Sequence, residues 1–331
     1  NFIHSKGEVQ TFLKSAANYW LTEYHFDGLR MDAISRIIYW MGDEARGVND
    51  RAVEFIKGLN QGLKERHPSC ILCAEDSTDY KGTTKEVRYD GLGFDYKWDM
   101  GWMNDTLNFF RTLPFCRGDQ YHKLSFSMMY FYNERYILPL SHDEVVHGKA
   151  TIAQKMNGGY DVKFPQARAF YMYMYAHPGA KLNFMGNELA QLKEWCEKDE
   201  MDWVLLKFPI HEAFHKFMAD LNKCYLKNNA FFQRDFTQGG FCWVDCHQEQ
   251  KCMYLFERIS GEQKVLAVFN FSDETQEYTL EKDYAGYELL LASDMVKYGG
   301  KKRYTKKEKE IKGGKAVFKM GPFSARYYLV K

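Results

Sequence analysis

The chain has 331 residues with a formal net charge of +1, and 45% of its residues are apolar. That size and composition allow two domains with a sizeable core, while the near-neutral charge excludes a global field for nucleic acid or an acidic membrane. No stretch is long and apolar enough for a bilayer span, so we expect no membrane partner. The eight cysteines are scattered through the chain, which is typical of free thiols in a cytoplasmic protein.

The first two thirds of the chain alternate between helical and strand-like patterns. Helical spacing of apolar residues predicts a helix that starts near Ser5 and further helices at 48–67, 103–112, 165–176 and 210–225. Pro165 is expected as the first residue of its helix, a position that proline favours. Short apolar runs predict strands at 26–31, 70–74, 92–97, 136–140 and 182–185. Strands that alternate with helices form parallel sheets, so these make about five of the eight strands of a (β/α)₈ TIM barrel.

The pattern changes after residue 227. Residues 228–331 hold short strand-like runs between turns with no helix signal, which predicts an all-β domain in the form of a two-sheet sandwich. We therefore expect a partial barrel at 1–227 and the sandwich at 228–331. The basic run 301–312 is interpreted as a solvated loop rather than a nucleic-acid patch, because no aromatic platform accompanies it.

Three of the predicted strands end in acidic residues. Arg30 and Asp32 lie two residues apart and share one face of the first strand. The nearby cation keeps the carboxylate ionised at neutral pH, which a nucleophile requires. Glu75 follows the second strand, and His142 with Asp143 follows the fourth. Because the carboxyl ends of parallel strands meet at one edge, we expect the three carboxylates to share a pocket. Taken alone, Asp32 would equally suit a helix cap, and the other two acids would suit turns.

Five stretches give these residues a family context. The sequences at 27–33 (DGLRMDA), 74–78 (AEDST) and 138–149 (LPLSHDEVVHGK) resemble three of the four signature regions of the α-amylase superfamily of glycoside hydrolases. Together with 93–103 (GFDYKWDMGWM) and 177–203, they are similar to bacterial-type 1,4-α-glucan (glycogen) branching enzymes, in the same order along the chain. Asp76 stands where glutamate is commoner and Asn187 where glycine is commoner, and neither departure carries the chemistry.

The resemblance implies a transglycosylase that cuts an α-1,4 bond of a glucan and remakes it as an α-1,6 bond, with retention of configuration. It assigns three catalytic carboxylates: the nucleophile Asp32, the acid/base Glu75 and the third carboxylate Asp143. The substrate-binding residues expected from the resemblance are Arg30, His142, Trp98 and Trp195. The two tryptophans would equally suit a role in plugging the barrel wall. The expected substrate is glycogen or amylose, and neither a cofactor nor a metal ion is implied.

Other interpretations of the chain remain open. The superfamily's first signature region has no counterpart here, so we expect the C-terminal part of a longer enzyme whose N-terminal barrel half supplies the missing strands. An amylase-type or debranching hydrolase and an inactive glycan-binding fragment are the alternatives. A zinc site is disfavoured, because neither His142 with His147 nor the Cys/His group at 242–252 has a standard ligand spacing.

Overall fold

The computed structural model describes residues 2–331, apart from the side chains at positions 309, 313 and 314. These residues form two compact units. The first runs up to Gly101 and includes Met128–Ile137, and the second consists of Trp102–Ser127 and Leu138–Lys331. None of the described helices is both long and apolar enough to cross a membrane.

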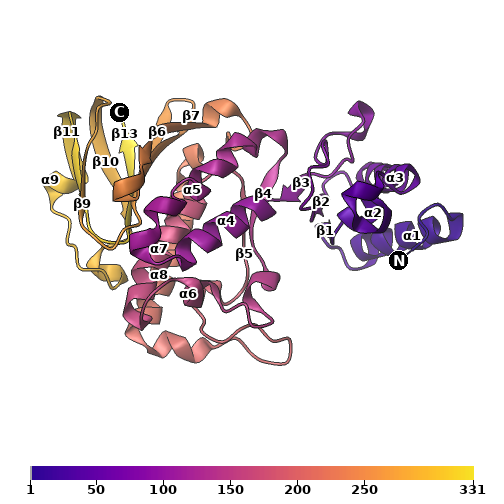
Figure 1. Ribbon diagram of the computed structural model, residues 1–331, viewed down its shortest axis with the longest axis horizontal. Coiled ribbons are helices and arrows are strands. Elements are labelled where there is room, and N and C mark those ends of the chain that lie inside the picture. Colours follow the sequence, from indigo (N-terminus) through magenta and orange to yellow (C-terminus); the bar gives the residue numbers. More distant parts are fainter. Residues whose placement is uncertain (1) are drawn as a thin grey trace. The chain divides into compact units, whose positions relative to one another are not determined.

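The first unit alternates helices with short parallel strands (Figure 1). Its elements are α1 (Gly7–Glu23), β1 (Gly28–Met31), α2 (Ser35–Ile38), α3 (Asp50–Arg66), β2 (Ile71–Ala74), β3 (Tyr96–Trp98) and the start of β4 (Tyr136–Leu140). Asn49 caps α3, since its side chain accepts a hydrogen bond from the Ala52 N–H at 3.3 Å. The buried face of α3 packs on Leu72 of β2 in one apolar cluster, and that packing fixes the strand beneath the helix.

Five strands form a single sheet in the order β1-β2-β3-β4-β5, which confirms the predicted partial barrel. The first three pairings are parallel, with Met31 opposite Ala74, Ala74 opposite Lys97, and Lys97 opposite Tyr136. Residues that follow β1 and β2 therefore lie at the same edge of the sheet.

The second unit begins with helices. Its helices and its parallel strand are α4 (Met100–Arg111), α5 (Lys123–Phe126), α6 (Ile152–Lys155), α7 (Tyr160–Ala176), β5 (Ala180–Asn183) and α8 (Pro209–Lys227). The prediction that Pro165 opens its helix is wrong, because α7 begins at Tyr160 and includes the proline. Gly159 in extended conformation precedes the helix, and the Val162 and Lys163 N–H groups both donate to its carbonyl. The first turn is therefore built by backbone bonds upstream of the proline.

The all-β part contains two antiparallel sheets. Six strands have the order β11-β10-β13-β8-β7-β6, and two have the order β12-β9. Their bounds are β6 (Phe241–Gln248), β7 (Met253–Ser260), β8 (Gln263–Asn270), β9 (Gln276–Thr279), β10 (Tyr284–Ala292), β11 (Glu310–Gly314), β12 (Val317–Met320) and β13 (Ser324–Val330). An apolar cluster fills the space between the sheets with side chains such as Leu255, Leu266 and Phe318, so the predicted sandwich is confirmed.

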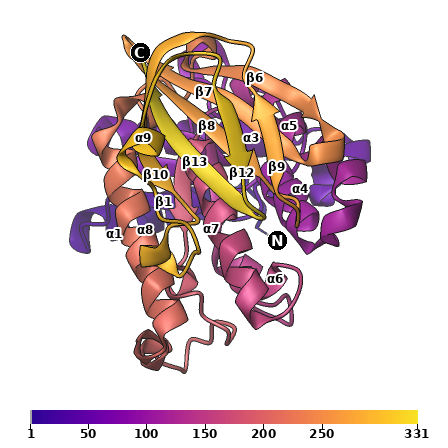
Figure 2. The ribbon, with the colours of Figure 1, turned by 90° about the vertical axis from the view of Figure 1, so that its left-hand side faces the viewer.

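Helix α7 packs against the other face of the six-stranded sheet (Figures 1 and 2). The Tyr327 hydroxyl donates to the Met172 carbonyl, and Arg258 Nη1 donates to the Ala176 carbonyl at 2.8 Å. These bonds join the sandwich to the helix within one unit. The predicted boundary between residues 227 and 228 stays a prediction.

The basic run 301–312 is not a plain loop. It contains the short helix α9 (Lys306–Lys309) and most of β11. Thr305 and Glu308 form a capping box around the first turn of α9. The expectation of no helix after residue 227 is therefore wrong at this point, because the capping box supplies the bonds that the short turn lacks.

Candidate active site

The ends of β1 and β2 are joined by backbone hydrogen bonds. The Glu75 N–H donates to the Met31 carbonyl at 2.9 Å, and the Ile34 N–H donates to the Glu75 carbonyl at 3.0 Å. Between them, Ala33 takes a left-handed φ of +42°, and its N–H donates to Glu75 Oε2 at 3.3 Å. A strained alanine at this position turns an N–H toward a carboxylate, which is typical of a functional site. The residue that caps α2 is Ile34, so Asp32 is not the helix cap.

Arg30 contacts both of the first two predicted carboxylates. Its Nη2 lies 2.8 Å from Asp32 Oδ1 and 2.5 Å from Glu75 Oε2. The Asp32 side chain is 75% exposed, whereas that of Glu75 is 20% exposed. One carboxylate therefore faces open space beside a cation, and the other is largely enclosed.

Burial raises the pKa of Glu75 above its ordinary value, and a hydrogen bond with the Asp32 side chain raises it further. The charge of Arg30 and the Ala33 N–H act in the opposite direction without cancelling that rise. A raised pKa keeps the proton on Glu75 longer as the pH rises, which is what a general acid requires. Glu75 is therefore suited to donate a proton and Asp32 to attack.

Trp98 lies at the end of β3 and supports Arg30. The guanidinium carbon is 4.1 Å from the centroid of the indole ring, and Trp98 is only 6% exposed. A cation held on an aromatic face keeps its direction, so the ring orients the side chain that contacts Asp32 and Glu75. Direct contact between Trp98 and a sugar stays a prediction.

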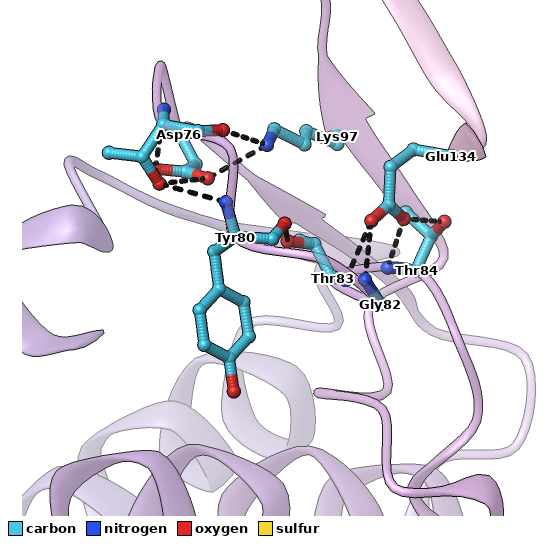
Figure 3. A network of polar contacts seen from close by, with 8 residues as sticks. Asp76, Tyr80, Gly82, Thr83, Thr84, Lys97 and Glu134 are labelled. Atoms are coloured by element: carbon cyan, nitrogen blue, oxygen red, sulfur yellow. Dashed lines mark hydrogen bonds and ion pairs between the residues drawn. The ribbon is translucent and has the colours of Figure 1, made fainter. Parts of the chain in front are cut away.

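A buried ion pair follows Glu75 directly (Figure 3). Lys97 Nζ lies 2.8 Å from Asp76 Oδ2 and donates to the Thr78 carbonyl at 3.0 Å. The Thr78 hydroxyl also donates to Asp76, at 2.9 Å from Oδ1. Thus the segment after Glu75 is tied to β3.

A second carboxylate holds the next part of the same segment. Glu134 accepts hydrogen bonds from the N–H groups of Gly82, Thr83 and Thr84 at 2.7–2.9 Å, and from the Thr84 hydroxyl (Figure 3). A carboxylate that receives several backbone donors fixes their loop firmly. Sequence reasoning missed both Lys97 and Glu134. A lysine inside the apolar strand at 96–98 was the one available signal.

The end of β4 carries the other predicted residues, in the second unit. The Ser141 hydroxyl accepts from the Asp143 N–H at 3.2 Å and starts a turn of 3₁₀ helix at His142–Val145. His142 Nε2 lies 3.4 Å from Asp143 Oδ1. The ring of Trp195 meets that of His142 edge to face, with centroids 6.1 Å apart. The backbone N–H of Trp195 donates to the Val145 carbonyl at 3.0 Å.

The predicted site residues thus form two groups. Arg30, Asp32, Glu75 and Trp98 are together in the first unit, and His142, Asp143 and Trp195 are together in the second. Convergence of the two groups in one pocket stays a prediction. Within residues 2–331 as described, no cluster of three or more His, Cys, Asp or Glu side chains is arranged to hold a metal ion.

Comparison with known proteins shows which proteins the chain resembles. A family profile described as "Alpha amylase, C-terminal all-beta domain" matches residues 243–331. The 1,4-alpha-glucan branching enzyme GlgB of Bacillus subtilis (strain 168) is 40% identical over 319 residues, which cover 95% of this chain and 51% of the relative. The enzyme of the same name from Bacillus caldolyticus is 41% identical over 304 residues, or 91% of this chain and 46% of the relative.

Solved structures share the fold at low sequence identity. The alpha-amylase of Geobacillus thermoleovorans, solved with acarbose, aligns with a TM-score of 0.66 at 14% identity over 100% of this chain and 65% of its own. A pullulanase from Anoxybacillus sp. LM18-11, solved with maltotetraose, aligns with a TM-score of 0.67 at 12% identity. The alignment covers 99% of this chain and 47% of the pullulanase chain.

The parallel sheet followed by this sandwich is the architecture of the α-amylase superfamily. The chain is similar to the 1,4-alpha-glucan branching enzymes of that superfamily over more than nine tenths of its length. It spans about half the length of the curated relatives it matches.

Proposed function

We propose that the protein carrying this chain is a glucan branching transglycosylase. It cleaves an α-1,4 bond in a glycogen-like glucan and transfers the cut chain to a 6-hydroxyl, which creates an α-1,6 branch. The observation that carries the proposal is the bridge of Arg30 between an exposed Asp32 and an enclosed Glu75 at neighbouring strand ends. Its support is the identity of 40% to relatives named as branching enzymes.

The reaction takes place in two displacements. In the first, a carboxylate oxygen of Asp32 attacks the anomeric carbon while Glu75 gives its proton to the departing glycosidic oxygen. The bond to that oxygen breaks, and a glycosyl ester on Asp32 forms. In the second, the Glu75 carboxylate takes the proton of an acceptor 6-hydroxyl, whose oxygen displaces Asp32. Two inversions at the same carbon retain the α configuration.

The second group of residues binds the same sugar in this proposal. Asp143 accepts hydrogen bonds from the hydroxyl groups of the sugar as the sugar ring flattens toward an oxocarbenium ion. His142, the adjacent residue, donates a hydrogen bond to the same sugar. The Trp195 ring orients the imidazole by the edge-to-face contact described above. The substrate is an α-1,4-glucan such as amylose or glycogen.

Incubation of the intact protein with amylose separates transfer from hydrolysis. A branching enzyme lowers the iodine colour with little new reducing sugar, since each cut bond is remade. Abundant new reducing ends would favour an amylase-type or debranching hydrolase. The Asp32→Asn protein is the control for contaminating activity.

An inactive glycan-binding fragment is the second candidate. It is supported by the chain's coverage of only 51% of the relative from Bacillus subtilis and by five strands where eight close a barrel. We expect residues 1–331 alone to be inactive, and addition of the N-terminal part of a branching enzyme to restore turnover. Turnover by the isolated chain would contradict this expectation. A cytoplasmic location also stays a prediction, which fractionation of cells would check.

A further inference from the structure

A groove of about 910 Å³ in the sandwich borders α9, β11, β12 and β13. It lies outside the residues assigned to the reaction. Its volume is that of a site for a small organic ligand and is far larger than a single inorganic anion needs. Besides Lys302, four lysines line it: Lys306, Lys307, Lys312 and Lys319.

The charges on the groove are unbalanced. A fifth lysine, Lys302, lies 3.2 Å from Glu308 Oε1, and the other oxygen of Glu308 accepts from the N–H and hydroxyl of Thr305 at 2.9 Å. That glutamate is therefore fully engaged. The four lysines named above have no acidic partner among the described residues, and Glu310 is the one other acid in the lining. A positive excess of this kind attracts an anion.

Arg326 forms part of the floor. Its side chain is 4% exposed, and Nη2 donates to the Lys319 carbonyl at 2.9 Å. Asp294 Oδ2, at 3.5 Å, offsets part of its charge. The guanidinium also interacts with the Tyr328 hydroxyl, but its buried Nε atom makes no hydrogen bond of ordinary geometry among the described residues. A buried donor without an acceptor is costly, so its presence points to a ligand oxygen.

The aromatic and apolar side chains of the groove further restrict the chemical class of the ligand. Lys302 Nζ lies 4.8 Å, and Arg326 Cζ lies 5.2 Å, from the centroid of the Tyr304 ring. Two cations thus already contact this ring, which leaves it a poor stacking platform for a base. Phe318 and Tyr328 also border the groove, but each is only 1% exposed. The accessible apolar lining is therefore aliphatic, at Ile311 and Val317, and suits the C–H face of a sugar ring.

We propose that this groove binds a phosphorylated sugar, with the phosphomonoester among the lysines and the ring against Ile311 and Val317. The phosphate oxygens accept charge-assisted hydrogen bonds, which lysine supplies as a point charge. The same chemistry is present in a free sugar phosphate and in a phosphate ester on a glucan chain. The proposal does not depend on the branching activity, because binding is measured without turnover.

Calorimetric titration of the intact protein tests the proposal. The probes are glucose 6-phosphate, glucose, inorganic phosphate, a phosphorylated maltooligosaccharide and a short single-stranded DNA. The Lys312→Met/Lys319→Met protein removes two of the lining cations. Lys301→Met is the matched control, because Lys301 is exposed in the same segment and lies outside the lining. Equal thermal midpoints and circular dichroism spectra show that the variants remain folded.

We expect glucose 6-phosphate or the phosphorylated oligosaccharide to bind, and the tighter of the two identifies the source. The double variant should lose about tenfold or more in affinity, Lys301→Met should lose none, and added salt should weaken binding. Glucose should not bind. Equal binding of inorganic phosphate would overturn the sugar assignment, and tighter binding of DNA would overturn the ligand class. Absence of binding by both phosphorylated sugars, or unchanged affinity in the double variant, would overturn the site itself.

Discussion

Lys97 Nζ lies 2.8 Å from Asp76 Oδ2, and neither side chain is more than 6% exposed. Lys97 is on β3, and Asp76 follows Glu75 in the chain. The pair therefore joins the end of one strand to its neighbour one residue beyond the proposed acid. Removal of one partner should disturb both the fold and the position of Glu75.

Lys97→Met should destabilise the protein by about 3–5 kcal/mol, because it leaves the Asp76 charge buried and unpaired. The double variant Lys97→Met/Asp76→Asn removes both charges and should recover most of that loss. Urea unfolding of the two proteins measures the difference. A double variant no more stable than Lys97→Met would contradict the prediction.

Asp32→Asn and Glu75→Gln should each lower kcat by several orders of magnitude, since both groups act mainly at the transition state. Asp27→Asn is the matched control, because Asp27 is an exposed acid of the same segment and its backbone carbonyl alone bonds to β2. The initial rate of iodine-colour loss with amylose measures the effect. Near-normal turnover by Asp32→Asn would remove its assignment as nucleophile.

Glu75→Gln should become more stable than the parent as the pH rises. The folded-state pKa of Glu75 is raised above its ordinary value of 4.5, chiefly by burial. The stability that protonation of the parent supplies is therefore complete below pH 4.5 and is lost as the pH passes the raised value. Glutamine stays neutral and avoids that loss. Unfolding free energies of both proteins between pH 4 and 8 check this, and a difference independent of pH would contradict it.

Trp98→Leu should reduce kcat about tenfold through loss of the cation–π contact with Arg30. Because the ring acts through Arg30, KM should change less than kcat. Trp98→Phe keeps an aromatic face and should retain more activity than the leucine variant. An equal loss in both variants, with a proportional rise in KM, would instead favour direct contact with the sugar.

Lys155 should make the free energy of unfolding depend on pH in the alkaline range. Burial lowers its pKa to about 8, and its ammonium group donates to the carbonyls of Glu144 and Ala150. Between about pH 8 and 10.5 the unfolded chain holds a proton that the folded chain has lost, so stability rises with pH in that window. The advantage of the parent over Lys155→Met should grow there by about 1–3 kcal/mol. A constant difference between the two proteins would refute the assignment.

The acidic ends of these strands could be predicted because each is a local pattern. An apolar run that ends in an acid predicts the place of Asp32, Glu75 and Asp143 from a few neighbouring residues. The contacts of Lys97 and Glu134 could not be predicted in this way, since their partners lie 21 and 52 residues away in the sequence. A local pattern contains no record of such a pairing.

The predicted bounds of secondary-structure elements were wrong where tertiary hydrogen bonds outweighed the local sequence pattern. The strand expected at 92–97 forms only at Tyr96–Trp98, because the Leu92 and Phe94 N–H groups donate to the carbonyls of Gly82 and Thr83 instead of a strand. The sequence of the basic run at 301–312 predicts no aromatic platform beside it. The ring of Tyr304 in fact contacts one cation of the run, Lys302, and a second cation, Arg326, from the distant strand β13.

Strand β13 lies between β10 and β8 in the six-stranded sheet, although it is made after both. During synthesis on the ribosome, β8 and β10 therefore wait without their shared neighbour until residue 330 has emerged from the exit tunnel. Before that moment the nascent chain exposes two unpaired strand edges, which are a target for chaperones and for misassociation. Removal of β13 would accordingly divide the sheet in the middle, whereas loss of an edge strand would only trim it.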